Sequence, residues 1–324
     1  MSQKICVISF DHWNYDKHIV SALQKKGIDS FHIKIGGFKH KNIGTRINNT
    51  FSKIFLGKNP KLKKRQEYII ETLKQRGFQD QILVINPELI DKEFHLQIKN
   101  FTNRYIAYLY DSVDRCPVEH LLNGIFDVIY SFDKEDIKKY GFLETTNYNY
   151  IETINNDKSN IKNDLLYIAS FDNRLDKLIP IKEYLLNQNI IYRFIIIGKK
   201  TTLFQLKNLF SNKLVGLELR RKRIEQQDLK QLYLETKVVL DIVRENQTGL
   251  SFRIFEAMAF ERKIITNNKN VKNYNFYNPN NIYIIENRDL HINKIFFDTP
   301  YQSLPLEIYN QYTLSDWVTK IFKL

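Results

Sequence analysis

Short runs of β-branched and aromatic residues alternate along the chain with longer stretches in which apolar residues recur at helical spacing. In the first half, the runs that predict strands lie at residues 4–10, 28–35, 82–86, 105–110, 127–131 and 148–151. In the second half, they lie at residues 165–170, 191–197, 214–219, 237–242, 263–266 and 282–285. Strands that alternate with helices of crossover length form parallel sheets. The pattern therefore predicts an α/β protein.

The expected helices lie between these runs, at 17–26, 60–76, 174–188, 202–212, 226–236 and 250–260. Twelve strands exceed the usual size of one sheet, and 324 residues are enough for about two domains. A polar segment at 152–163, rich in Asn, Asp and Lys, is typical of a linker between them. We expect two doubly wound, Rossmann-like domains facing across a cleft, at residues 1–155 and 156–312. An amphipathic helix within 313–324 is expected to pack back on the first domain.

The composition excludes several classes of protein and kinds of site. A hydrophobic content of 43% with 13% aromatic residues is enough for two buried cores and excludes a disordered chain. Two cysteines exclude a disulfide scaffold and a zinc site with four Cys ligands. No apolar run approaches the roughly 18 residues of a membrane span, and the N-terminal run is too short for a signal peptide. We expect a cytoplasmic protein that is soluble or peripheral on the inner face of the cytoplasmic membrane.

The chain is basic, with 49 Lys and Arg against 36 Asp and Glu and a formal net charge of +13. Its cations gather at Lys39, Lys41, Lys53, Lys58, Lys61, Lys63, Lys64 and Arg65, and again at Arg220, Arg221, Lys222 and Arg223. Such clusters are usually solvated faces, but they also attract anionic membranes and nucleic acids. The sequence has no helix-turn-helix, zinc-finger or RNP motif, so nucleic acid is the less favoured partner.

Candidate chemistry in the first domain lies where two predicted strands end. Ligands of doubly wound sheets bind at the carboxyl ends of the strands, where the strand order reverses. We place this point between the first and fourth strands, which end at Asp11-His12 and at Asp111. Either carboxylate, or the His12 imidazole, is a candidate general base. The alternative is that each aspartate caps the turn that follows it.

The most informative segment of the second domain is 239–258. There a buried strand runs into a polar loop, Gly249 and a helix that begins near Ser251. Gly249 lets the backbone approach a ligand, and the first N–H groups of a helix bind anions. Arg253 and Glu256 share one helix face, which suits a phosphate and sugar or ribose hydroxyls. The alternative is an ion pair on the surface of the helix.

Two further cations follow strands of the second domain. Arg174 opens the helix after the strand at 165–170, and Lys199 follows the turn residue Gly198 after the strand at 191–197. A cation at a helix N-terminus is suited to a diphosphate. We therefore add both residues to the candidate anion site.

The run Gly-Leu-Ser-Phe-Arg-Ile-Phe-Glu-Ala-Met-Ala-Phe-Glu-Arg-Lys-Ile-Ile-Thr at 249–266 resembles the donor-binding segment of GT-B glycosyltransferases. Asp-His-Trp-Asn-Tyr-Asp-Lys-His at 11–18, Leu-Tyr-Asp-Ser at 109–112 and Phe-Asp-Val-Ile-Tyr-Ser-Phe-Asp at 126–133 are similar to the bacterial lipopolysaccharide and capsule transferases of that fold. The resemblance implies a nucleotide-sugar donor in the second domain, with Glu256 on the ribose. The residues it assigns to the donor are Arg174, Lys199, Arg244, Thr248, Gly249, Leu250, Ser251, Arg253 and Glu256.

The resemblance leaves the stereochemical outcome open. Many retaining members carry a Glu eight positions before Glu256, and this sequence has Thr248 there. The absence of that Glu is compatible with an inverting mechanism, in which Asp11, His12 or Asp111 is the base. The Asp-x-Asp arrangement of metal-dependent GT-A transferases does not occur in the sequence, and the histidines lack metal-ligand spacing. We expect no metal and no cofactor other than the nucleotide-sugar substrate.

These observations predict a metal-independent glycosyltransferase that acts on a glycan or lipid-linked glycan of the bacterial surface. Three alternatives stay open: a sugar-nucleotide epimerase of the same fold, a basic protein that modifies or binds nucleic acid, and a nucleotide- or glycan-binding module without catalysis. The identity of the sugar, the nucleotide and the acceptor depends on the shape of the pocket, which the sequence does not define.

Overall fold

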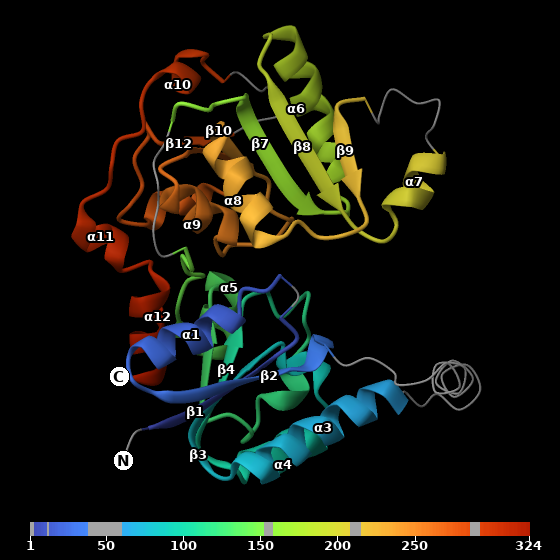
Figure 1. Cartoon of the computed structure of the whole chain (residues 1–324), viewed down its shortest axis with the longest axis vertical. Coiled ribbons are helices and arrows are strands. Elements are labelled where there is room, and N and C mark those ends of the chain that lie inside the picture. Colours follow the sequence, from blue (N-terminus) through green and yellow to red (C-terminus); the bar gives the residue numbers. More distant parts are fainter. Residues whose placement is uncertain (1–2, 12, 38–59, 152–157, 208–214, 286–291) are drawn as a thin grey trace. The chain divides into compact units, whose positions relative to one another are not determined.

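The computed structural model describes every residue except 1–2, 12, 38–59, 152–157, 208–214 and 286–291 (Figure 1). The contacts within the chain divide it into two compact units. The N-unit comprises Met1–Thr146 and Leu314–Leu324, and the C-unit comprises Asn147–Thr313. The domain boundary expected between residues 155 and 156 lies outside the described residues.

The N-unit is built on a six-stranded parallel sheet in the order β2-β1-β3-β4-β5-β6. Its strands are β1 (Lys4–Ser9), β2 (Asp29–Lys34), β3 (Gln79–Ile85), β4 (Thr102–Leu109), β5 (Val128–Ser131) and β6 (Leu143–Glu144). The inner strands β1, β3 and β4 are buried at almost every position. Such continuous burial is typical of a parallel sheet that is covered on both faces.

The helices of the N-unit come from both ends of the chain. They are α1 (Lys17–Lys25), α3 (Pro60–Arg76), α4 (Lys92–Lys99), α5 (Lys134–Tyr140) and α12 (Leu314–Phe322), with 3-10 turns η1 (Ile35–Gly37), η2 (Pro87–Leu89) and η3 (Glu119–Leu121). The C-terminal helix α12 contacts α1, and Figure 1 shows the two side by side. The apolar face of α12 is buried at helical spacing, by Leu314, Trp317, Val318, Ile321 and Phe322.

The C-unit has a second six-stranded parallel sheet, in the order β12-β11-β10-β7-β8-β9. Its strands are β7 (Asn163–Ser170), β8 (Tyr192–Ile197), β9 (Leu217–Arg220), β10 (Thr236–Asp241), β11 (Lys263–Thr266) and β12 (Ile282–Ile284). Its helices are α6 (Leu175–Asn187), α7 (Thr201–Lys207), α8 (Gln226–Leu234), α9 (Phe252–Ala259), α10 (Ile295–Asp298) and α11 (Leu306–Asn310), with the 3-10 turn η5 (Lys269–Asn273). The predicted α/β class, with two doubly wound parallel sheets, is confirmed.

The strand expected at 148–151 does not form, and its residues belong to the C-unit. Asn149 makes only an isolated bridge to Thr313, and the sixth strand of the N-unit is β6 instead. The alternating Asn and Tyr residues follow the sequence pattern of a half-buried strand, but their side chains bind helices. Tyr150 donates to Glu256 in α9, and Asn149 donates to Tyr309 in α11. Asn147 Nδ2 donates to the carbonyl oxygen of Leu250 at 2.8 Å, and the residues around it form the first part of the C-unit.

The strand order reverses at one place in each sheet, between β1 and β3 in the N-unit and between β7 and β10 in the C-unit. The prediction that the first and fourth strands of the N-unit are neighbours is wrong, because β3 lies between β1 and β4. Asp11 and Asp111 therefore follow strands that are not adjacent. In the C-unit, the loops after β7 and β10 carry most of the residues expected to bind a donor.

Candidate functional site

The loops after β7 and β10 meet at the place where the C-unit sheet reverses its order, which is where doubly wound sheets bind ligands. Five charged residues from these loops and from α9 interact there. We call them the switch-point network, and they are Asp172, Arg174, Asp241, Arg244 and Arg253.

Asp241, the last residue of β10, anchors one half of the network. It is fully buried, and its Oδ1 accepts hydrogen bonds from Ser251 Oγ at 2.6 Å and Arg253 Nε at 2.9 Å. Thr266 Oγ1 donates to the other oxygen at 3.2 Å. Burial alone would lower the pKa of the Arg253 guanidinium, but the Asp241 carboxylate outweighs this effect and raises it. Arg253 is therefore charged and held in place inside the site.

Asp172, in the loop after β7, anchors the other half. It accepts two parallel hydrogen bonds from Arg174 Nε and Nη2, each 2.8 Å long, and one from Arg244 Nη2 at 2.7 Å. Burial favours the neutral acid, but the two guanidinium groups outweigh it and lower the pKa of Asp172. Arg174 Nη1 also donates to the carbonyl oxygen of Ile242, so this arginine ties the two loops together.

The three arginines differ in how far they reach the surface. The side chains of Arg174 and Arg253 are 7% and 16% exposed, whereas that of Arg244 is 26% exposed. Lys199, at the end of β8, is exposed. Arg244 and Lys199 are therefore the cations of this edge best placed to contact an external anion. Arg174 and Arg253 hold the loops in position.

Helix α9 begins within this network. Its N-cap residue Ser251 does not cap the helix through its side chain, because the hydroxyl donates to Asp241. The turn before it is held by Asn268 Nδ2, which donates to the carbonyl oxygen of Gly249 at 3.1 Å. Within this turn, Thr248 is half-buried, and Gly249 and Leu250 are buried. Three arginines against two aspartates leave a positive excess beside the positive end of a helix, and this arrangement binds anions.

Glu256 lies deeper than the sequence suggested. It is 1% exposed, and its two carboxylate oxygens accept hydrogen bonds from Tyr150 at 2.7 Å and Tyr233 at 2.5 Å. Arg253 pairs with Asp241 instead, so the surface ion pair considered for Arg253 and Glu256 does not form. A ribose at Glu256 would have to replace the tyrosine hydroxyls as the hydrogen-bond donors to its carboxylate.

Gly198 has a packing role at the end of β8. A Cβ atom at this position would lie 2.9 Å from the Cβ of Phe171, closer than real Cβ atoms approach. The glycine lets the loop after β7 pack against the end of β8, and Lys199 follows this contact in the chain.

In the N-unit, Asp11 is buried and already neutralised. Its Oδ2 forms an ion pair with Lys34 Nζ at 2.9 Å, and its Oδ1 accepts the backbone N–H of Asp16 at 3.0 Å. The Asp11 backbone is left-handed, with φ of 49°. His12 lies outside the described residues.

Asp111 is the more accessible of the two expected carboxylates. Its side chain is 19% exposed, and its Oδ2 pairs with Arg115 Nη1 at 2.6 Å. The neighbouring Tyr110 hydroxyl donates to Asn86 Oδ1 at 3.1 Å, across the ends of β4 and β3. The carboxyl edge of the N-unit sheet is thus lined with polar groups, although its two aspartates do not follow adjacent strands.

Sequence reasoning missed Asp16, which is buried beside Asp11. Burial is the main cause that raises its pKa to about 7, and the Asp11 charge adds to it. It also missed Asn86, which follows β3 in the left-handed conformation, with φ of 63°. The available signal for Asn86 was a polar residue between a buried strand and Pro87. Asp16 gave no signal, because its burial depends on packing between α1 and the sheet.

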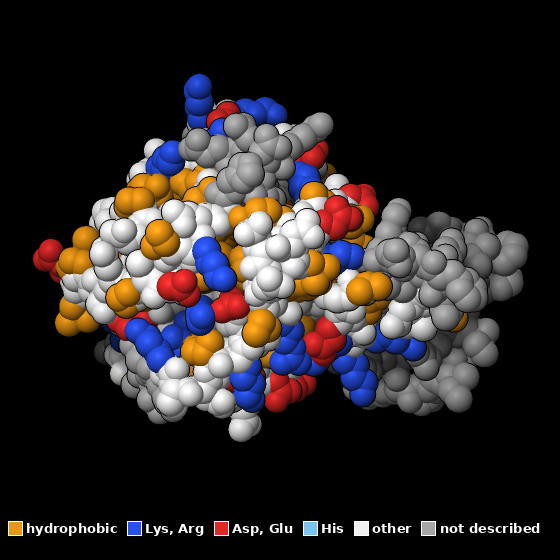
Figure 2. Space-filling view, turned by 90° about the horizontal axis from the view of Figure 1, so that it is seen from above, with side chains coloured by type: hydrophobic (Ala, Val, Ile, Leu, Met, Phe, Trp, Pro, Cys, Tyr) orange, Lys and Arg blue, Asp and Glu red, His pale blue; other side chains and the backbone are white. Residues whose placement is uncertain are grey.

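The predicted basic clusters are only partly described. Lys39, Lys41, Lys53 and Lys58 lie outside the described residues. In the second cluster, Arg220 Nε donates to Glu218 Oε1 at 2.6 Å. Figure 2 shows Lys and Arg side chains interspersed with acidic and apolar ones on the face it presents.

No family model matches the chain, and no curated protein matches it in sequence. Solved structures do match over nearly its whole length. An α-glucosyltransferase in complex with UDP and a 13-mer DNA containing a HMU base has a TM-score of 0.60 at 12% identity, covering 99% of this chain and 96% of that one. The UDP-GlcNAc 2-epimerase of Methanocaldococcus jannaschii has a TM-score of 0.58 at 13% identity, covering 99% of both chains. The chain has the GT-B fold.

A third GT-B neighbour is a UDP-forming α,α-trehalose-phosphate synthase from Burkholderia xenovorans, with a TM-score of 0.58 at 12% identity, covering 100% of this chain and 98% of that one. Both nucleotide-sugar transferases and epimerases thus share this GT-B architecture. Within the described parts of the GT-B chain, no helix is long and apolar enough to cross a membrane. The same residues contain no group of three or more His, Cys, Asp or Glu side chains placed to hold a metal ion.

Proposed function

We propose that the chain is a metal-independent glycosyltransferase that takes a sugar from a nucleotide-sugar donor bound to its C-unit. The positive excess of the switch-point network beside the N-terminus of α9 is the observation that carries this proposal. It is suited to a nucleoside diphosphate, because guanidinium groups and helix N–H groups both bind phosphate. The GT-B neighbours that bind UDP or form it support the same assignment.

The donor residues act in two groups in this proposal. Arg244, Lys199 and the turn formed by Thr248, Gly249, Leu250 and Ser251 contact the diphosphate and the sugar. Arg174 and Arg253 position these groups, because their guanidinium groups are taken up by aspartates and backbone carbonyls. Glu256 binds the ribose by exchanging the tyrosine hydroxyls for ribose hydroxyls.

The transfer step follows from these roles. A base removes the proton of an acceptor hydroxyl, the oxygen attacks the anomeric carbon, and the bond from that carbon to the nucleoside diphosphate breaks. The cations of the switch-point network stabilise the negative charge of the departing diphosphate. We assign the base to Asp111 because its side chain is 19% exposed, whereas that of Asp11 is fully buried; both carboxylates pair with a cation. The acceptor in this proposal is a glycan or lipid-linked glycan of the bacterial surface.

The first test is nucleotide binding to Arg244→Met. Loss of a charge-assisted contact should weaken the binding of UDP or another nucleoside diphosphate by about tenfold, or about 1.4 kcal/mol. Isothermal titration calorimetry with a panel of nucleoside diphosphates measures the change. Arg193→Met is the matched control, because Arg193 is 34% exposed and also pairs with one carboxylate, that of Glu218. Equal affinities in both variants would contradict the donor assignment.

An epimerase is the second candidate, and the similarity to the UDP-GlcNAc 2-epimerase favours it. An epimerase converts the nucleotide sugar without an acceptor, whereas a transferase needs one. Incubation of the chain with the donor alone, followed by analysis of the sugar, separates the two reactions.

A DNA acceptor is the third candidate, favoured by the net charge of +13 and by the DNA bound to one neighbour. Sugar transfer to duplex DNA, measured beside transfer to glycan acceptors, decides between these acceptor classes. Nucleotide binding without turnover on any acceptor would indicate a binding module instead.

A further inference from the structure

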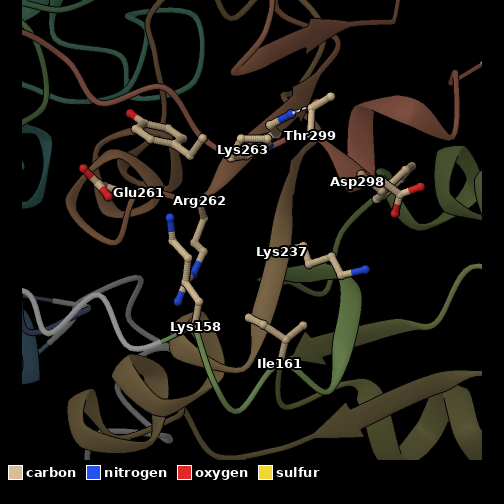
Figure 3. A pocket seen from close by; sticks show the side chains of 11 residues that line it. Lys158, Ile161, Lys237, Glu261, Arg262, Lys263, Asp298 and Thr299 are labelled. Atoms are coloured by element: carbon tan, nitrogen blue, oxygen red, sulfur yellow. Dashed lines mark hydrogen bonds between the residues drawn. The ribbon is translucent and has the colours of Figure 1, made fainter.

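A second cationic site lies at the opposite edge of the C-unit sheet. A pocket of about 240 Å³ is lined by Lys158, Ile161, Lys237, Glu261, Arg262, Lys263, Phe297, Asp298, Thr299, Pro300 and Tyr301 (Figure 3). Lys237 and Lys263 stand at the beginnings of β10 and β11, whereas Asp241 and Thr266 stand at their ends. Because the strands are parallel, this pocket is separate from the switch-point network.

Lys263 is the central feature of the pocket. Its side chain is buried, and its Nζ donates to the carbonyl oxygen of Phe296 at 2.9 Å and to Thr299 Oγ1 at 2.5 Å, as Figure 3 shows for Thr299. Both of these partners are neutral oxygens, and the ammonium also lies 4.6 Å from the centre of the Phe296 ring. No described carboxylate forms an ion pair with Lys263. Burial lowers the pKa of the ammonium group. A buried cation without a counter-charge is unfavourable unless an anion approaches it.

The neighbouring cations increase the positive potential. Arg262 is buried as well, and its guanidinium donates to the carbonyl oxygens of Tyr233 and Leu234 at the end of α8. Lys237 pairs with Asp164 at 2.7 Å, and Lys158 is exposed at the rim.

Two carboxylates also line the pocket. Glu261 is engaged by Ser303 Oγ, which donates to it at 2.7 Å, and Asp298 is exposed. The four cations face three carboxylates, those of Glu261, Asp298 and the Asp164 that pairs with Lys237, which leaves an excess of one positive charge. The backbone and hydroxyl oxygens around Lys263 do not remove this excess, so the pocket favours an anionic occupant.

The remaining wall defines the kind of anion. Ile161, Phe297, Pro300 and Tyr301 contribute apolar surface beside the cations. A volume of about 240 Å³ has room for a phosphate group with a small attached moiety. The combination is typical of sites that fix a small ligand by one charged group and pack the rest against apolar side chains.

We propose that this pocket binds a small phosphorylated metabolite, with its phosphate on the Lys263 ammonium and its other end against the apolar wall. The ammonium group has three N–H donors, of which the described partners accept two. In this proposal the third N–H donates to a phosphate oxygen, and the exposed Lys158 adds long-range attraction from the rim.

Titration of the full chain with inorganic phosphate by isothermal titration calorimetry tests this proposal. Lys263→Met keeps the length of the side chain and removes its charge, so the phosphate dissociation constant should rise about tenfold or more. Lys182→Met is the matched control, because Lys182 is also a buried lysine of the C-unit and lies outside the pocket. It should leave phosphate affinity unchanged.

Equal affinity in the wild-type chain and a folded Lys263→Met variant would overturn the proposal. The proposal would also be overturned if Arg244→Met lost phosphate binding while Lys263→Met kept it, because the anion would then occupy the switch-point network. If circular dichroism shows that Lys263→Met does not fold, the double variant Lys158→Gln/Lys237→Gln changes only the partly exposed rim. It should weaken phosphate binding about tenfold, and unchanged affinity would overturn the proposal equally.

Discussion

At the scale of single residues, the carboxylates of the two units lie in opposite environments. Asp172 pairs with Arg174 and Arg244, and Asp241 pairs with Arg253, so both carboxylates fix arginines in place. Asp16 is buried beside the carboxylate of Asp11, where ionisation is unfavourable. The same residue type therefore organises a charged network in the C-unit and holds a proton near neutral pH in the N-unit.

Asp16 should make the stability of the N-unit depend on pH. Its pKa rises from 3.8 to about 7 on folding, so its protonated form contributes stability in full below pH 3.8, and this contribution is lost as the pH rises through about 7. The free energy of unfolding should fall by up to about 1.4 kcal/mol per pH unit within that window. Asp16→Asn should flatten the slope, as measured by urea unfolding at a series of pH values. The exposed Asp29→Asn is the control, and identical slopes in Asp16→Asn and the wild-type chain would refute the assignment.

Glu256 offers a second test at this scale. If its carboxylate receives ribose hydroxyls, Glu256→Gln should weaken nucleoside diphosphate binding about tenfold while leaving inorganic pyrophosphate binding unchanged. Pyrophosphate has no ribose, so it reports on the switch-point network alone. Calorimetric titration of both ligands, with circular dichroism as the check on folding, measures the difference. An equal loss for both ligands would show that Glu256 acts only through the packing of Tyr150 and Tyr233.

At the scale of secondary-structure elements, α12 is held to the N-unit by both packing and hydrogen bonds. Trp317 is buried, its ring lies edge-on to Tyr108 at 5.1 Å, and its Nε1 donates to the carbonyl oxygen of Thr146 at 3.0 Å. Arg104 in β4 donates to the carbonyl oxygen of Ile321 at 2.9 Å. The helix thereby satisfies polar groups of the sheet as well as covering its apolar surface.

Trp317→Ala should therefore destabilise the N-unit. Replacement of a buried large aromatic residue by Ala costs about 3–5 kcal/mol. Differential scanning calorimetry should show a lower melting temperature for the N-unit transition and little change for that of the C-unit. Ser315→Ala on the exposed side of α12 is the control. A uniform shift of both transitions would mean that α12 does not belong to the N-unit alone.

At the scale of the whole molecule, hydrophobic periodicity was enough to predict two parallel α/β sheets, because buried parallel strands such as 82–85 and 238–240 are continuous apolar runs. It failed at 148–151, where Tyr150 binds Glu256 of α9 and Asn149 binds Tyr309 of α11 instead of extending a sheet. It also could not place β3 between β1 and β4, since the order of strands depends on contacts far apart in the chain. The sequence identified charged residues in the loops after strands. It did not show which of these residues would be paired with an opposite charge.

The predicted donor residues illustrate the same limit. Spacing along α9 placed Arg253 and Glu256 on one helix face, and only the packing around β10 and α8 decides that one pairs with Asp241 and the other with tyrosines. The pocket around Lys263 gave no signal, because its cations come from three separate segments of the chain, at 158, 237 and 262–263. The sequence therefore predicted which edge of the sheet carries the candidate site, but not the hydrogen-bond or ion-pair partner of each side chain.

The N-unit is assembled from residues that flank the whole C-unit in the chain. During synthesis on a ribosome, its sheet and first helices emerge early, while the helix that covers them emerges only after the intervening 147–313. Because domains fold as the chain is made, the later half can reach its native state first. Until α12 is made, the apolar surface that it covers, which includes Tyr108, is exposed, and chaperones have a surface to bind.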